Sequence, residues 1–291
     1  MSGPRPQSPS ANGHAPGYRA IRWDMDWVMR PLFGIVLAGI AILALVWPEY
    51  FAGMVVLITI LAAYEWHRMI AVGRDYRLET AITSLAAAAA VLILLISRQI
   101  GPALLAVAIG ALAAVLVARS RGQSPVWQGL GVVYLGLPAI ALVSLRAFPE
   151  RGWQVIAGLF LIVWATDTGA LIFGKLIGGP RMAPVLSPSK TWAGTIGGSV
   201  TAALVFSCYI WLLGGTLWIA ALFGLVFSAV AHAGDLFESF VKRRFGIKNS
   251  GSLIPGHGGV LDRMDSTIFA SVALAILVFG AHFNLLFGIA S

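Results

Sequence analysis

Two acidic residues near the end of the chain have the spacing of a site that handles phosphate. The stretch 252–266, SLIPGHGGVLDRMDS, places Asp262 and Asp265 three residues apart, so both carboxylates face one side if a helix begins there. Carboxylate oxygens are ligands that Mg²⁺ prefers, and Mg²⁺ commonly binds substrate phosphates at the same time. The simpler alternative is a helix N-terminus whose acids only offset the helix dipole.

The sequence HAGDLFESFVKRRFG supplies the same residue types slightly earlier in the chain. Asp235, Glu238 and Lys242 fall at i, i+3 and i+7, along one face of a helix. Asp167 stands inside the apolar stretch LFLIVWATDTGALIFGK, where a charge is costly and tends to be functional. Solvated charges with an internal salt bridge, or a locally capped carboxylate, would explain these residues without a site.

Two loops carry residues suited to binding an anion. In Gly256-His257-Gly258-Gly259 the glycines would let the backbone approach a phosphate that a Cβ would keep away. In the run 187–191, SPSKT, hydroxyls and one lysine precede an apolar stretch, where a helix N-terminus attracts anions. Plain N-capping by Ser189 or Thr191 is the alternative for the second loop.

The elements that must position these residues are apolar. The chain has 291 residues, of which 58% are hydrophobic and 11% charged, and its mean hydropathy is +0.86. Soluble domains are about 45–50% apolar, so this composition predicts an all-α, polytopic integral membrane protein. The apolar blocks predict about nine transmembrane helices at 32–47, 51–66, 81–97, 101–118, 126–145, 153–173, 192–213, 217–234 and 267–287.

Basic residues orient the predicted helices. With a cytoplasmic N-terminus, 17 of the 20 lysines and arginines fall on the cytoplasmic side, as the positive-inside rule expects. This places the active-site loops in the cytosol and favours a bacterial-type inner membrane. Membrane topology also explains the net charge of +8 better than nucleic-acid binding does. We expect a disordered N-terminus at 1–30 without a cleavable signal, transmembrane helices at 31–150 and a catalytic region at 151–291.

Part of this sequence resembles a known family. The stretch 239–265, SFVKRRFGIKNSGSLIPGHGGVLDRMD, is similar to the hallmark of phosphatidate cytidylyltransferases. The residues in register are Ser239, Lys242, Arg243, Lys248, Pro255, His257, Gly258, Gly259, Asp262, Arg263 and Asp265. The resemblance extends to ATDTGALIFGK, SPSKTWAG and GDLFESFVKR, and covers roughly residues 150–270. Three positions depart from the family pattern, namely Ser189, Ala193 and Asn249.

The resemblance implies that CTP and phosphatidate react to give CDP-diacylglycerol and pyrophosphate, with Mg²⁺ alone or Mg²⁺ and a second cation, and in a homodimer. The implied catalytic residues are Asp262, Asp235, Lys242 and Arg263. The implied metal ligands are Asp262, Asp235, Asp265 and Asp167. The implied substrate-binding residues are Ser187, Lys190, Thr191, Arg243, His257, Gly258 and Gly259, with loop ordering an equal role for His257.

Two other functions fit parts of the pattern. A sister CTP:lipid-phosphate enzyme could act on an isoprenoid lipid, because apolar helices do not distinguish fatty-acyl from isoprenoid tails. An ion-coupled transporter could use Asp167 and Asp235 as a cation relay. Transporter acids usually lie near the bilayer midplane, whereas these collect at one predicted interface with lysines and glycines, which favours the enzyme.

Overall fold

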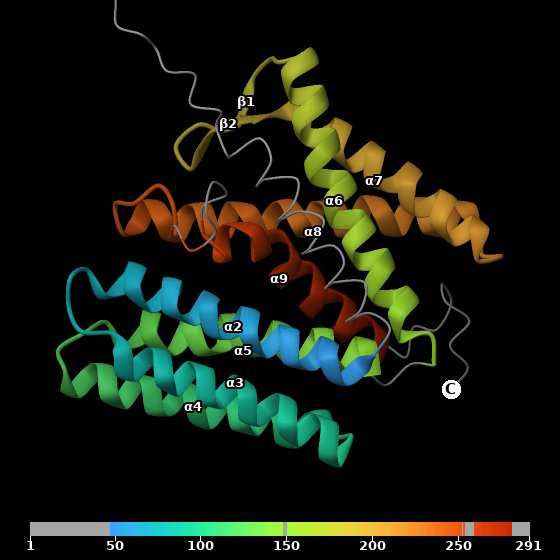
Figure 1. Ribbon diagram of the computed structural model, residues 1–291. Helices are drawn as coiled ribbons and strands as arrows, with labels where there is room; N and C mark the ends of the chain where they lie inside the picture. Colours follow the sequence, from blue (N-terminus) through green and yellow to red (C-terminus); the bar gives the residue numbers. More distant parts are fainter. Residues whose placement is uncertain (1–46, 148–149, 252, 254–258, 281–291) are drawn as a thin grey trace, which may run out of the picture. The chain divides into compact units, whose positions relative to one another are not determined.

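The computed structural model describes residues 47–147, 150–251, 253 and 259–280 (Figure 1). All of them belong to one compact unit, Gly39–Ser291. The helices in this part of the chain are α2 (Pro48–Ala71), α3 (Arg77–Ser97), α4 (Ile100–Ser120), α5 (Pro125–Ala147), α6 (Gly152–Leu176), α7 (Trp192–Leu212), α8 (Leu217–Arg244) and α9 (Leu261–Ala275). A π-helical turn, η1 (Ile276–Gly280), continues α9.

These helices confirm the predicted fold class. Eight helices in the described ranges are long and apolar enough to cross a membrane, the last of them counted as Leu261–Gly280. Large apolar side chains such as Leu85, Ile96 and Leu112 are exposed on α3 and α4, as lipid-facing positions require. The prediction for 32–47 lies outside the described residues.

Two predicted boundaries were wrong, and both errors fall at the site. The helix predicted at 217–234 continues to Arg244, because Glu238 and Lys242 form an i,i+4 ion pair that supports the extra turns. The helix predicted at 267–287 begins six residues earlier, at Leu261, since the Asp262 carboxylate accepts the N–H of Gly259 at the helix start. Polar residues therefore extend both helices beyond their apolar blocks.

A small hairpin interrupts the helices between α6 and α7. Strand β1 (Arg181–Ala183) pairs antiparallel with β2 (Ser187–Thr191), with Arg181 opposite Thr191. Thr191 also caps α7, because its Oγ1 accepts the N–H of Gly194 at 3.1 Å. The sequence had predicted only a loop here; the hairpin places Lys190 two residues before the first residue of α7, Trp192.

Small residues bring α6 and α7 into close contact. A Cβ on Gly198 would lie 2.6 Å from the carbonyl oxygen of Thr166, and one on Gly194 would lie 2.8 Å from that of Ala170. In a membrane, where apolar surface gains little by leaving lipid, such small residues let backbones pack closely. The close approach sets Asp167 on α6 beside the hairpin that carries Lys190.

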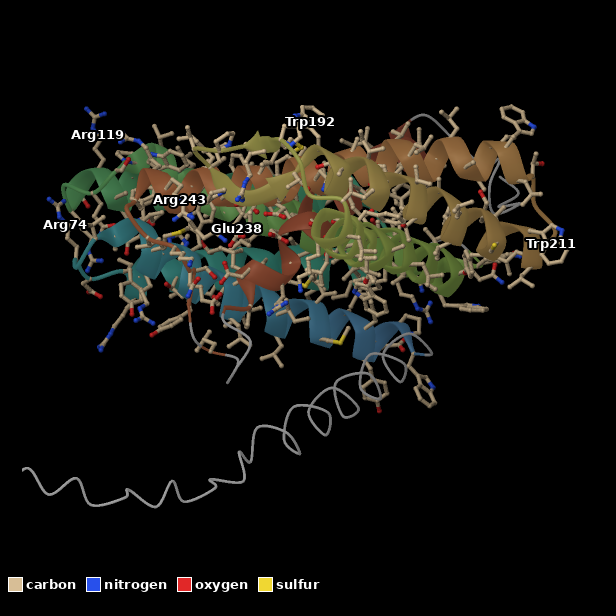
Figure 2. All side chains as sticks on the ribbon, turned by 90° about the horizontal axis from the view of Figure 1, so that it is seen from above. Arg74, Arg119, Trp192, Trp211, Glu238 and Arg243 are labelled. Atoms are coloured by element: carbon tan, nitrogen blue, oxygen red, sulfur yellow. The ribbon has the colours of Figure 1, made fainter. Side chains whose placement is uncertain are left out.

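The helix ends differ in side-chain character. Figure 2 shows Arg74 and Arg119 near each other at one end of the helices, with Arg243 toward the same end, and Trp211 at the opposite end. Helix α9 packs against α8 and α5, and Figure 1 shows it between them. The N-terminal part of α9 therefore lies next to the C-terminal part of α8, where the predicted site residues occur.

Candidate active site

A charged pocket forms where α6, β2, α7 and α8 meet. Its volume is ≈ 360 Å³, and its lining includes Asp167, Lys190, Thr191, His232 and Asp235. The lysine Nζ of Lys190 makes an ion pair with Asp235 Oδ2. The sequence places these residues up to 68 positions apart, and helix packing brings them together.

Three carboxylates from three helices gather here, two of them lining the pocket and the third beside them. Asp167 on α6, Asp235 on α8 and Asp265 on α9 are close enough to repel one another electrostatically. Lys190 and Arg263 oppose this charge, and both act on Asp167. Asp265 also has local partners: its Oδ1 accepts the N–H of Ser266 at 2.7 Å, and its carboxyl group shares a hydrogen bond with Glu238. The arrangement concentrates negative charge that a cation would stabilise.

Asp262, one turn from Asp265, has a different environment. Its Oδ1 accepts a hydrogen bond from Lys242 Nζ at 2.7 Å. Its Oδ2 accepts the N–H groups of Gly259 and Ser250, each at 3.2 Å. Lys242 Nζ also donates to Glu238 Oε2 at 2.9 Å, and the Glu238 side chain is fully buried. The internal salt bridge foreseen as a simpler explanation for Glu238 and Lys242 is therefore present, and it is tied to Asp262.

Three predicted substrate-binding residues make contacts within the chain. Arg243 donates from Nε to the carbonyl of Leu186 at 3.3 Å and from Nη1 to that of Ile247 at 3.2 Å, which joins the hairpin turn to the end of α8. Ser187 is half-buried at the start of β2, opposite Ala183. Thr191 lines the pocket and caps α7 at once.

The glycine-histidine stretch is described only in part. His257 and Gly258 lie outside the described residues. Gly259 donates its N–H to Asp262, and a Cβ there would collide with Ser250 Oγ and lie 2.7 Å from Glu65 Oε2. Packing against these side chains gives Gly259 a structural reason to be glycine.

The comparison with protein families decides the class of this chain. Residues 28–280 match the model of the cytidylyltransferase family. The chain belongs to the cytidylyltransferase family. This membership agrees with the resemblance found in residues 239–265 of the sequence.

Individual members of the family are similar over about half of this chain. A phosphatidate cytidylyltransferase of Brucella melitensis is 44% identical over 160 residues, which is 54% of this chain and 58% of the relative. Enzymes of the same name are similar in Staphylococcus aureus, at 41% over 158 residues, and Staphylococcus epidermidis, at 42% over 152. Each match covers 51% of this chain and 57% of the relative. The chain thus spans just over half the length of these relatives.

Two residues near the site, His232 and Glu65, were not predicted from the sequence. His232 lines the pocket one turn before Asp235, and its spacing on α8 was a usable signal. Glu65 on α2 is fully buried and contacts the loop before α9. In the sequence, Glu65 is marked only as an acid at the end of an apolar block. It also precedes the predicted catalytic region at 151–291.

The carboxylates suit Mg²⁺ by donor type. They are hard oxygen ligands, and Asp167, Asp235 and Asp265 repel one another unless a cation offsets their charge. Across the described ranges no three His, Cys, Asp or Glu side chains form a group that could hold an ion by themselves. Mg²⁺ does not need such a group, because one or two carboxylates usually bind it together with water and substrate phosphates.

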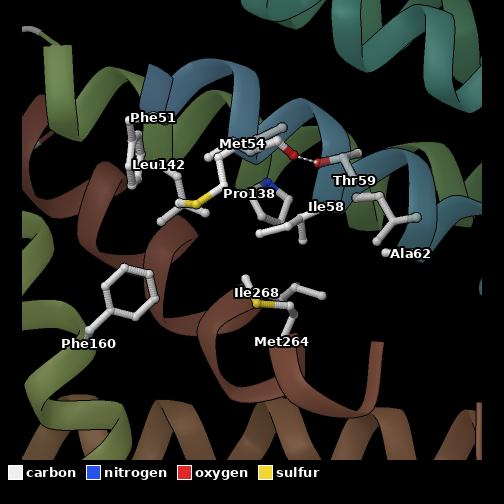
Figure 3. A pocket seen from close by; sticks show the side chains of 13 residues that line it. Phe51, Met54, Ile58, Thr59, Ala62, Pro138, Leu142, Phe160, Met264 and Ile268 are labelled. Carbon is white, nitrogen blue, oxygen red and sulfur yellow. Dashed lines mark hydrogen bonds between the residues drawn. The ribbon is translucent and has the colours of Figure 1, made fainter. Parts of the chain in front are cut away.

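A second cavity has the opposite chemistry. It lies among α2, α5, α6 and α9, has a volume of ≈ 40 Å³ and is lined by apolar side chains including Phe51, Leu142, Phe160 and Ile268 (Figure 3). Thr59 is its single hydroxyl-bearing residue, and that hydroxyl donates to the carbonyl of Val55 in its own helix. Charged groups are costly in such an apolar cavity, whereas the charged pocket has side chains that could bind them.

Proposed function

We propose that this protein is a phosphatidate cytidylyltransferase, which transfers the cytidylyl group of CTP to phosphatidate and releases pyrophosphate. The observation that carries the proposal is the charged pocket at the ends of apolar helices, which Asp167, Asp235 and Lys190 line, with Asp265 and Arg263 near these carboxylates. The names of the family relatives support the choice of substrates.

The reaction needs charge neutralisation more than a strong base. An oxygen of the lipid phosphate, already anionic near neutral pH, attacks the α-phosphorus of CTP, and the bond from that phosphorus to the β-phosphate oxygen breaks. Lys190 and Arg263 would neutralise the phosphates, as cationic side chains do in other phosphoryl transfers. Lys242 holds Asp262 in place, so its role combines charge and orientation.

The metal would be Mg²⁺, held by carboxylates among Asp262, Asp235, Asp265 and Asp167. When bound, Mg²⁺ draws charge from the phosphates and helps the pyrophosphate to leave. Asp262 already accepts three hydrogen-bond donors, from Lys242, Gly259 and Ser250. The carboxylates with fewer partners, Asp167, Asp235 and Asp265, are therefore the first-choice ligands, and Asp262 is a further ligand whose position its three donors fix.

The distribution of lysines and arginines along the chain supports a location for the active site relative to the membrane. The predicted 17-to-3 division of lysines and arginines supports a cytoplasmic N-terminus and a cytoplasmic active site in a bacterial-type inner membrane. CTP would then reach the pocket from the cytosol, while the acyl chains of phosphatidate stay among the exposed apolar side chains of the helices. A homodimer is part of the same proposal, and no nucleic acid is involved.

Purified protein in detergent should be incubated with radiolabelled CTP and a panel of lipid phosphates, with and without Mg²⁺. We expect labelled CDP-diacylglycerol and equimolar pyrophosphate only with phosphatidate and only with Mg²⁺. CDP-lipid formed only from an isoprenoid glycerophosphate would replace phosphatidate as the substrate. Absence of CDP-lipid with every acceptor would overturn the proposed reaction.

A further inference from the structure

Glu65 joins the N-terminal helices to the loop that precedes α9. The residue lies in the last third of α2 and its exposed fraction is 0%. Its Oε2 accepts the backbone N–H of Leu261 at 2.8 Å and the hydroxyl of Ser250 at 3.3 Å. These partners stand 196 and 185 positions later in the chain. A buried carboxylate is costly unless donors satisfy it, so these bonds hold the loop against α2.

Two glycines of the loop fit around this carboxylate. A Cβ on Gly251 would collide with Glu65 Oε1, and one on Gly259 would lie 2.7 Å from Oε2. Gly251 and Gly259 therefore pass on either side of the glutamate with no room for a side chain. The Glu65 carboxylate determines the path of the loop at both positions.

Both hydrogen-bond partners of Glu65 are in turn joined to Asp262, one through the chain and one through a hydrogen bond. Leu261, whose N–H Glu65 accepts, is the first residue of α9 and precedes Asp262 in the chain. Ser250 donates its hydroxyl to Glu65 and its N–H to Asp262. Gly259, packed against Glu65, donates its N–H to Asp262 as well. Glu65 itself is absent from the residues that line the charged pocket in the described structure.

We propose that Glu65 is a positioning residue that fixes the start of α9, and with it the Asp262 carboxylate, through Leu261 and Ser250. Its effect on turnover rests on the proposed cytidylyltransferase reaction, whereas its hold on the loop does not. Removing an outer partner of a catalytic ligand commonly costs about 10–100-fold in rate or affinity. A displacement of Asp262 by about 1 Å would be enough for a loss of this size.

The test compares Glu65→Leu and Glu65→Gln with Thr59→Val, a matched control. Thr59 is buried on the same helix, and its hydroxyl bonds the Val55 carbonyl in α2 and no other described residue. Hydrogen exchange of the peptide 259–266 in detergent-solubilised full-length protein reports on the loop without any substrate. Initial rates of CDP-lipid formation, at varied CTP and lipid, separate kcat from KM.

In Glu65→Leu we expect exchange of peptide 259–266 to rise about tenfold and kcat to fall about 10–100-fold, with KM for the lipid within about twofold. Glu65→Gln keeps an acceptor for the Leu261 N–H and a group that can bond the Ser250 hydroxyl, so it should recover most of both losses. Thr59→Val should match the wild type. Ser250→Ala, which removes one bond only, should give a smaller effect of the same kind.

Unchanged exchange and unchanged kcat in Glu65→Leu would overturn the positioning role. Equal loss in Glu65→Gln and Glu65→Leu would also overturn it, because the charge and not the hydrogen bonds would then matter. If Glu65→Leu fails to fold, Ser250→Ala and Glu65→Gln still decide between these outcomes. Wild-type protein that forms no CDP-lipid would refute the proposed reaction, while the exchange measurement would still test Glu65.

Discussion

Asp262 and Asp265 stand one helical turn apart on α9, yet their surroundings have opposite character. The Asp262 carboxylate accepts hydrogen bonds from Lys242 Nζ and from the N–H groups of Gly259 and Ser250. Glu65 of α2 accepts the N–H of Leu261, the residue before Asp262. Asp265 faces Asp235 and Asp167, which repel it. The first group is a hydrogen-bonded network that fixes geometry. The second group crowds three carboxylates, which Lys190 and Arg263 offset in part, and such crowding is typical of a site for a cationic ligand.

The largest expected effect comes from replacing Asp235, which belongs to the group of carboxylates around Asp265. Asp235→Asn removes one of the three repelling carboxylates and the partner of Lys190. We expect CDP-lipid formation to fall by about 10²–10³-fold, the usual cost of removing a group that stabilises transition-state charge. The thermal unfolding temperature should stay the same or rise, because like-charge repulsion is relieved. Near-normal turnover would remove Asp235 from the site.

Replacing Lys242 should destabilise the protein more than replacing Lys190. Lys242→Met leaves Glu238, whose side chain is 0% exposed, without its cation and also unpairs Asp262. Breaking a buried pair this way costs about 3–5 kcal/mol of unfolding free energy. Lys190→Met should lose activity with a much smaller change in stability, since Asp235 is partly exposed. Thermal unfolding of both variants in detergent measures this contrast, and equal losses would contradict the division into two groups.

Gly259→Ala should disturb the hydrogen-bonded network without touching a charge. The new methyl group would collide with Ser250 Oγ and press on Glu65 Oε2. Overpacking of this kind costs about 1–3 kcal/mol, and the loop shift should also lower turnover. The control is Gly53→Ala on α2, where a Cβ meets nothing within 4 Å. If Gly259→Ala behaves like Gly53→Ala, the tight packing around Glu65 is not required.

The smallest effect is expected at Arg243. Its side chain is exposed and bonds only backbone carbonyls of Leu186 and Ile247 among its described partners. Arg243→Gln should lower stability by about 0.5–1.5 kcal/mol, the net value of an ordinary hydrogen bond, and should leave KM for CTP within about threefold. A rise in KM for CTP above tenfold would instead support the triphosphate contact that the family resemblance implies.

The residues alone determined the class of the protein and most of its chemistry. Apolar blocks long enough to cross a bilayer determine a helical membrane protein, because backbone groups in hydrocarbon must be satisfied within the helix. The spacing of Asp235 with Lys242, and of Asp262 with Asp265, predicted the acids and bases of the proposed site, and the motif in 239–265 identified the family.

Only the tertiary structure showed which of these side chains contact one another. Helical spacing relates residues within one element, so it could not show that Lys242 of α8 binds Asp262 of α9, or that Lys190 of β2 pairs with Asp235. Helical spacing also treated Asp262 and Asp265 as equivalent, although Asp262 accepts a hydrogen bond from Lys242 whereas Asp265 lies near the carboxylates of Asp235 and Asp167. Glu65 acts across 196 positions of sequence, and only the packing of α2 against the start of α9 makes its carboxylate part of the site.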